Sequence, residues 1–175
     1  MPHPSSADVV REYTTLTPDF PESGILFRDL SRLFGDARAF RSVVDDLAAP
    51  FLGQFDLVAG AEARGFVLAA GVAVATGAGV LPLRKPGKLP PPLLSESYSL
   101  EYGDAQLQIG EGVVAPGRVL LIDDVLATGG TLAAARRLLE RAGHEVIGIA
   151  VVIELPELGG RARVSDLEVH ALLSE

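Results

Sequence analysis

Two adjacent acidic residues, Asp123 and Asp124, follow an apolar run and precede a loop of small residues. Ionised carboxylates only accept hydrogen bonds, so the pair suits a ligand that offers neighbouring hydroxyl groups, such as a sugar. The loop consists of Ala127, Thr128, Gly129, Gly130 and Thr131. Small side chains let backbone N–H groups approach an anion, and a helix expected to begin there adds a positive partial charge. The stretch therefore predicts a phosphate site beside a sugar site.

Two well-known phosphate-binding motifs are absent from this loop. No Lys-Ser or Lys-Thr pair follows its glycines, as a P-loop requires, and the sequence has no Gly-x-Gly-x-x-Gly motif for a dinucleotide. A purely structural interpretation also stands, in which the loop is a tight turn between a strand and a helix with capping acids. The loop alone does not decide between the two.

The hydrophobic pattern predicts the elements that must position this loop. It predicts helices over 36–52, over an alanine-rich stretch that ends near Thr76, and over 131–143. It predicts strands over 55–61, 79–84, 117–125 and 145–155. Strands that alternate with helices indicate an α/β fold, with a mainly parallel twisted sheet and helices on both faces. In such sheets ligands bind at the carboxyl ends of the strands, which is where the acidic pair is expected.

We expect one domain over residues 1–175. Its 48% hydrophobic and 22% charged residues are typical of a globular protein. The segment 85–104 carries no predicted helix or strand, and a loop of that length in a compact domain usually has a function. We therefore expect a flexible lid loop over the site.

Composition argues against several classes of protein. A net charge of -8 without a basic patch disfavours nucleic acid as a partner. The absence of cysteine excludes disulfides and thiolate metal sites and is compatible with the cytoplasm. The start of the chain does not have the pattern of a signal peptide. The uncharged run from Phe66 to Leu83 is interrupted by glycines and a proline, so we expect no membrane span.

The stretch VLLIDDVLATGGT (119–131) resembles the phosphoribosyl-diphosphate signature of type I phosphoribosyltransferases. Other segments resemble the adenine phosphoribosyltransferase family in order and spacing: FPESGILFRDL (20–30), GAEARGF (60–66), LRKPGKLP (83–90), YSLEYG (98–103) and VIELPELGGR (152–161). The resemblance spans nearly the whole chain. It implies that a 5-phosphoribosyl group passes from phosphoribosyl diphosphate to adenine, giving AMP and pyrophosphate, with Mg²⁺ as cofactor. It also implies a homodimer.

The resemblance implies roles for the residues around the transferred group. The loop 127–131 would hold the 5'-phosphate, and Asp123 and Asp124 the ribose hydroxyls. Arg64, with the backbone of Glu62 and Ala63, would bind pyrophosphate in a turn that often carries a cis peptide bond in the family. By its position alone, Arg64 is equally compatible with a surface arginine at a helix start. Mg²⁺ would be carried mainly by substrate oxygens and water, as its tight hydration favours.

Base and lid residues follow from the same resemblance. Residues 1–53 would form an N-terminal base-binding segment, in which Phe27 and Leu155 sandwich adenine and backbone groups at Leu26 and Arg28 read its edge. In the lid the implied contacts are Lys85 and Lys88 with pyrophosphate, and Glu101 and Tyr102 over ribose C1 and the base. Glu101, Arg64, Asp123 and Asp124 would be the catalytic group.

Two alternative functions stay open on the sequence. A phosphoribosyltransferase for another base would keep the phosphate loop and change the base pocket. A non-catalytic regulator could sense phosphoribosyl diphosphate while binding nucleic acid, which the acidic charge disfavours.

Overall fold

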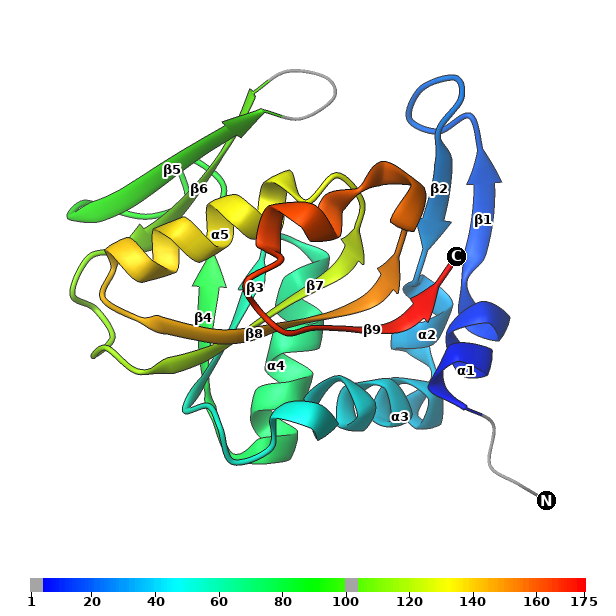
Figure 1. Ribbon diagram of the computed structural model, residues 1–175, viewed down its shortest axis with the longest axis horizontal. Helices are drawn as coiled ribbons and strands as arrows, with labels where there is room; N and C mark the ends of the chain where they lie inside the picture. Colours follow the sequence, from blue (N-terminus) through cyan, green and yellow to red (C-terminus); the bar gives the residue numbers. More distant parts are fainter. Residues whose placement is uncertain (1–4, 100–103) are drawn as a thin grey trace.

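The computed structural model describes residues 5–99 and 104–175 and has a parallel sheet at its centre (Figure 1). The sheet has five strands in the order β4-β3-β7-β8-β9. Their bounds are β3 Leu57–Ala61, β4 Gly79–Leu83, β7 Arg118–Leu126, β8 Glu145–Glu154 and β9 Val169–Ser174. All neighbouring pairs run parallel. The fold class predicted from the sequence is therefore confirmed.

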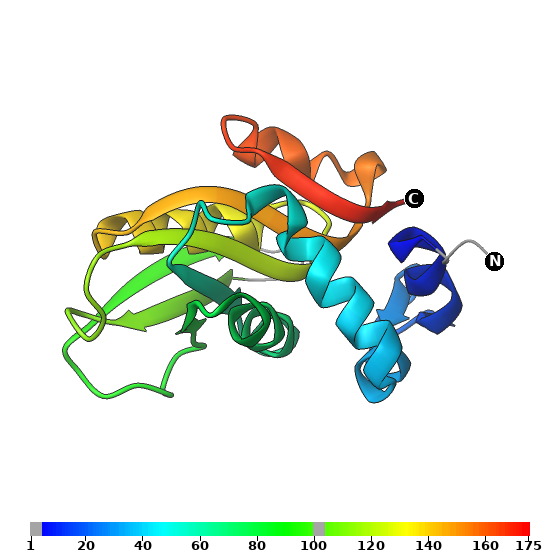
Figure 2. The ribbon, with the colours of Figure 1, turned by 90° about the horizontal axis from the view of Figure 1, so that it is seen from below.

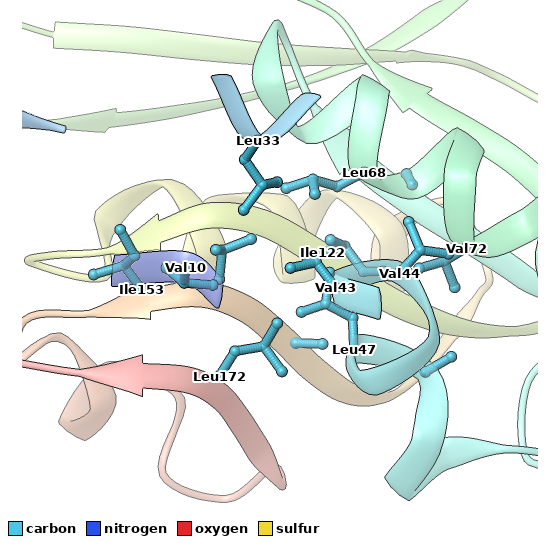
Figure 3. Close-up of a cluster of buried hydrophobic side chains, with 14 of the residues drawn as sticks. Val10, Leu33, Val43, Val44, Leu47, Leu68, Val72, Ile122, Ile153 and Leu172 are labelled. Atoms are coloured by element: carbon cyan, nitrogen blue, oxygen red, sulfur yellow. The ribbon is translucent and has the colours of Figure 1, made fainter. Parts of the chain in front are cut away.

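Helices cover both faces of this sheet. One face packs against helices α1 (Ser6–Tyr13), α2 (Ser31–Gly35), α3 (Ala37–Ala48) and α4 (Arg64–Thr76). The other packs against α5 (Gly130–Arg141). Figure 2 shows α4 on one side of the strands, and Figure 3 shows side chains from these helices meeting Ile122 and Ile153 of the sheet. Because apolar side chains cover both faces, the inner strands are buried along nearly their whole length.

The helix predicted over 36–52 is shorter than expected. Asp36 caps it, since its carboxylate accepts hydrogen bonds from the backbone N–H groups of Arg38 and Ala39, both at 2.9 Å. The α-helix ends at Ala48 and continues as the 3-10 turn Ala49–Phe51, because Pro50 has no N–H to continue the α-helical pattern. Phe51 still reaches the core, where its side chain is fully buried.

Two antiparallel hairpins stand at the edge toward which the arrowheads of β4, β7 and β8 point in Figure 1. One joins β1 (Thr15–Pro18) to β2 (Leu26–Asp29). The other joins β5 (Leu93–Ser99) to β6 (Asp104–Gly110). The expectation that 85–104 lacks regular structure is therefore wrong for β5. Its strand character depends on pairing with β6 and on Glu96, which accepts from Arg137 and Arg141 of α5.

The uncharged run from Phe66 to Leu83 does not form one helix. It is divided at Gly77, the left-handed residue (φ 75°) that ends α4 before β4 begins. Within residues 5–99 and 104–175, no helix has the length and apolar character needed to span a bilayer.

Candidate active site

Asp123 and Asp124 lie near the carboxyl end of β7, inside the strand rather than after it. Each is 8% exposed. The backbone N–H of Asp124 donates to Oδ1 of Asp123 at 3.0 Å. Oδ2 of Asp124 is buried and accepts no aligned hydrogen bond from the described residues, although Nη2 of Arg64 lies 2.8 Å away. A buried carboxylate oxygen of this kind favours a hydroxyl or amide donor from a ligand.

Burial raises the pKa of Asp123 well above its ordinary value, and the negative charge of Asp124 raises it further, while Arg64 opposes both effects. The folded protein therefore holds a proton on Asp123 at a pH where the unfolded chain has lost it. The contribution of Asp123 to stability falls as pH rises from the ordinary range of a carboxyl group through the raised pKa. Asp123 thus costs stability at neutral pH, which is typical of groups kept for function.

Arg64, the first residue of α4, connects this acidic pair to the N-terminal hairpin. Its Nη1 donates to the backbone carbonyl of Arg28 at 2.8 Å, and its guanidinium lies 5.3 Å from the ring centre of Phe27. Its third contact is the 2.8 Å ion pair with Asp124. Arg64 does lie at a helix start, as expected, but its side chain is only partly exposed and has partners on two strands. One guanidinium contacts two residues of β2 and one of β7.

A cavity of about 450 Å³ lies beside these groups. Residues named from the sequence line it: Glu62, Ala63, Arg64, Lys85, Asp123, Asp124 and Thr131. Sequence reasoning missed Ala61, Tyr98, Ala105 and Val125, which also line it. Tyr98 is the first residue of the segment 98–103 that resembles the family, so the resemblance could have identified it. The cavity brings together the two acids of β7, Thr131 in the first turn of α5, and the residues that join β3 to α4.

The turn between β3 and α4 is held by the side chain of Glu62. Its carboxylate accepts from the backbone N–H of Lys85 at 2.8 Å and pairs with Nε of Arg84 at 3.3 Å. These donors lower the pKa of Glu62, and the charge of Lys88 adds to the effect. The Glu62–Ala63 peptide bond is cis, as the resemblance implied. Glu62 thus fixes Lys85 at the cavity, whereas Lys88 is exposed and does not line it.

The loop 127–131 joins β7 to α5, and Gly129 has φ 77°. No side chain caps α5 within the part of the chain that the structure describes, so the N–H groups of its first turn suit an anion. The structure adds a second reason for glycine at position 129. A Cβ there would lie 3.0 Å from the carbonyl carbon of Gly160 and closer still to its oxygen. Gly129 therefore permits close packing against Gly160, in addition to a left-handed conformation.

The residues named for the base lie in β2 and directly after β8. Leu26, Phe27 and Arg28 belong to β2, where Phe27 packs edge-to-face on Phe20 at 5.1 Å. Leu155 follows β8, is 7% exposed, and donates its backbone N–H to Leu126 at 2.9 Å. Phe27 is thus linked to the acids through Arg64, and Leu155 to the phosphate loop through Leu126. Glu101 and Tyr102 lie outside the described residues.

Comparisons with known proteins show the family to which the chain belongs. The sequence profile of the phosphoribosyl transferase domain matches residues 34–171. A protein named adenine phosphoribosyltransferase from Clavibacter sepedonicus is 58% identical over 175 residues, covering 99% of this chain and 91% of that one.

Solved structures give the same result. The chain is similar to the adenine phosphoribosyltransferase of Rhodothermus marinus, with a TM-score of 0.90, 42% identity, and coverage of 97% of this chain and 98% of that one. It is also similar to the Saccharomyces cerevisiae enzyme, whose structure holds adenine and an imino-altritol bisphosphate, with a TM-score of 0.89 and 33% identity. That match covers 96% of this chain and 98% of the yeast chain.

Proposed function

Because the chain belongs to the phosphoribosyltransferase family, and within it to the adenine phosphoribosyltransferases, we propose a role in catalysis for each group of residues in the site. The enzyme is a pentosyltransferase of purine salvage. It transfers the 5-phosphoribosyl group of phosphoribosyl diphosphate to adenine and forms AMP and pyrophosphate. The observation that carries the residue roles is the chain of contacts from Asp124 through Arg64 to Arg28 and Phe27.

The acidic pair holds the ribose. Asp124 accepts a hydrogen bond from a ribose hydroxyl through its buried Oδ2, and Asp123 holds the neighbouring hydroxyl. The loop 127–131 and the first turn of α5 bind the 5'-phosphate through backbone N–H groups. These contacts fix C1 of the ribose between the base and the leaving pyrophosphate, so that the reaction depends chiefly on positioning.

Arg64 has to exchange partners during the reaction. Its guanidinium contacts the Phe27 ring and the Arg28 carbonyl, the two groups assigned to adenine. When phosphoribosyl diphosphate binds, Arg64 turns to the pyrophosphate, where Lys85 and Lys88 also neutralise charge. This movement of Arg64 leaves the Arg28 carbonyl free to accept a hydrogen bond from the 6-amino group of adenine. Glu101 and Tyr102 close over C1 and the base, and segment 85–104 acts as the lid, both by resemblance.

The donors at the site fit Mg²⁺, a cation that takes oxygen ligands and usually binds through one or two carboxylates plus substrate phosphates. The carboxylates of Asp123 and Asp124 would hold the ribose hydroxyls, and these hydroxyls would carry the ion together with diphosphate oxygens and water. Mg²⁺ would supply positive charge against the diphosphate. The protein's own residues bind the ribose, orient the base and exclude water.

Turnover with a panel of bases tests the assignment of the base pocket. With Mg²⁺ and phosphoribosyl diphosphate, we expect pyrophosphate release with adenine and little with hypoxanthine, guanine or xanthine. The reason is that the Arg28 carbonyl accepts a hydrogen bond from the 6-amino group of adenine, whereas the other three bases have a 6-oxo group, which cannot donate one. Removal of Mg²⁺ with a chelator should abolish the release with adenine. Comparable rates of pyrophosphate release with hypoxanthine and adenine would contradict the proposed recognition of the base by the Arg28 carbonyl.

A homodimer in the cytoplasm completes the proposal. Helix α4 has no charged residue after Arg64, yet Val67 is 42% and Val74 85% exposed. An apolar helix with one face in water favours burial against another protein surface. A groove of about 690 Å³ lies between α4 and α3 beside these residues. A second copy of the chain is the occupant that we propose for this face.

Val74→Asp should convert the dimer to a monomer, because a carboxylate in an apolar interface loses its hydration without gaining a partner. Light scattering after size-exclusion chromatography measures the mass. Val113→Asp is the matched control, since Val113 is 76% exposed on the loop after β6, away from α4. An unchanged dimer mass for Val74→Asp would place the interface elsewhere.

A further inference from the structure

The connection between β8 and β9 (155–168) lies directly against the loop 127–131. A Cβ on Gly160 would lie 2.7 Å from the backbone nitrogen of Gly129 and even closer to the carbonyl oxygen of Ala127. A Cβ on Gly129 would in turn strike the Gly160 carbonyl. The two backbones therefore touch with no side chain between them. If Gly160 moves, the loop 127–131 has to move with it.

Little within the connection itself fixes Gly160. It is the first residue of the second of two 3-10 turns, Pro156–Leu158 and Gly160–Val164, and such short turns have few hydrogen bonds of their own. The preceding residue, Gly159, has φ 67° and open space where a Cβ would be. Val164 anchors the far end in the core, where it is fully buried. The end at Gly160 is held by the side chain of the next residue, Arg161.

Arg161 ties this part of the connection to two strands. Its Nε and Nη2 donate to the carboxylate of Glu154, at 2.7 and 2.5 Å, and Nη1 donates to the carbonyl of Val169 at 2.8 Å. Glu154 is the last residue of β8 and is 6% exposed, while Val169 begins β9. Such a two-pronged pair fixes direction as well as distance. These hydrogen bonds also lower the pKa of Glu154, so the carboxylate stays ionised.

We propose that Arg161 is a positioning residue for 5'-phosphate binding, because its pair with Glu154 holds the Gly160 backbone against the loop 127–131. The inference rests on the proposed function of that loop. Arg161 acts through Gly160 and touches no substrate. Since Leu155 starts the same connection, the pair also sets the distance between one side of the base site and the phosphate loop.

The test compares two probes on the full-length enzyme by calorimetry. Ribose 5-phosphate reports on the phosphate loop and the strand acids, whereas inorganic pyrophosphate reports on Arg64 and Lys85. Arg161→Gln should weaken ribose 5-phosphate binding about tenfold, as expected for a displaced binding loop, and leave pyrophosphate binding unchanged. KM for phosphoribosyl diphosphate should rise in parallel, and Arg161→Lys should restore part of the affinity.

Arg136→Gln is the matched control. Arg136 lies on α5 and makes a similar two-pronged pair with Asp166, at 2.6 and 2.7 Å. Asp166 lies in the same connection but beyond the buried Val164, so this pair holds the far end of the connection and not Gly160. The control substitution should lower the melting temperature without changing the affinity for ribose 5-phosphate. Glu154→Gln provides a second variant that removes the buried charge while keeping its shape, and it should weaken ribose 5-phosphate in the same direction as Arg161→Gln.

Equal affinities of the Arg161→Gln and Arg136→Gln variants for ribose 5-phosphate would overturn the positioning role and leave the phosphate loop assignment intact. An equal loss for ribose 5-phosphate and pyrophosphate would also overturn it, because that result indicates general loosening of the fold. If the wild-type enzyme itself does not bind ribose 5-phosphate, the assignment of the loop fails, and this inference fails with it.

Discussion

Asp124→Asn should lower kcat/KM for phosphoribosyl diphosphate about 100-fold, because a hydrogen bond to a charged acceptor contributes roughly 1.5–3 kcal/mol. The substitution keeps the size of the side chain and removes the charge of the buried Oδ2, the atom proposed to hold the ribose. It also weakens the 2.8 Å ion pair with Arg64. Steady-state kinetics with adenine in excess measures the effect.

Two controls separate this effect from a loss of folding. Asp45→Asn removes another carboxylate that pairs with an arginine, Arg41, at 2.7 Å on the exposed face of α3. It should leave kcat/KM unchanged. The Asp124→Asn protein should melt close to the wild-type temperature, because the substitution also relieves repulsion with Asp123. A variant with normal kcat/KM would remove Asp124 from the ribose site.

Arg64→Ala should have opposite effects on catalysis and on adenine binding. Turnover should fall about 1000-fold, as expected when a charged group that stabilises the leaving group is lost. Adenine alone should bind the variant about tenfold more tightly than the wild type, because the guanidinium no longer competes for the Phe27 ring and the Arg28 carbonyl. Calorimetric titration with adenine in the absence of other substrates measures this gain.

Pyrophosphate should produce the same gain in adenine affinity in the wild-type enzyme. If it draws Arg64 away from β2, it should tighten adenine binding to the wild type, and adenine should tighten pyrophosphate binding by the same factor. Phe27→Ala provides the control, since loss of the ring should weaken adenine in both backgrounds. Unchanged adenine affinity in Arg64→Ala would show that the guanidinium does not compete with the base.

The sequence predicted the elements whose signals are local. The apolar run of β7 and the helical pattern of α5 each lie within a short stretch, so hydrophobic periodicity suffices for them. The strand β5 was missed because its identity depends on distant partners. From the sequence alone, Glu96 is interpreted as a surface acid, because its partners Arg137 and Arg141 lie in the distant helix α5.

The same distinction applies to the site. The acidic pair and the small-residue loop are contiguous, so their chemistry can be inferred from residue types. That Arg64 joins Asp124 to Arg28 depends on contacts between residues far apart in the chain. One reason for Gly129 is its contact with Gly160, 31 positions away, and nothing in the loop itself indicates that partner.

The contact between Gly129 and Gly160 bears on how base preference could be altered by engineering. Neither glycine can acquire a side chain without displacing the other backbone, so the connection after β8 cannot be rebuilt without disturbing the phosphate loop. The hairpin of β1 and β2 has no such constraint. It forms a separate two-stranded sheet, and its exposed Leu16, Phe20 and Leu26 leave room for change. A library that aims at a new purine should therefore vary residues 15–29 and keep residues 155–164 fixed.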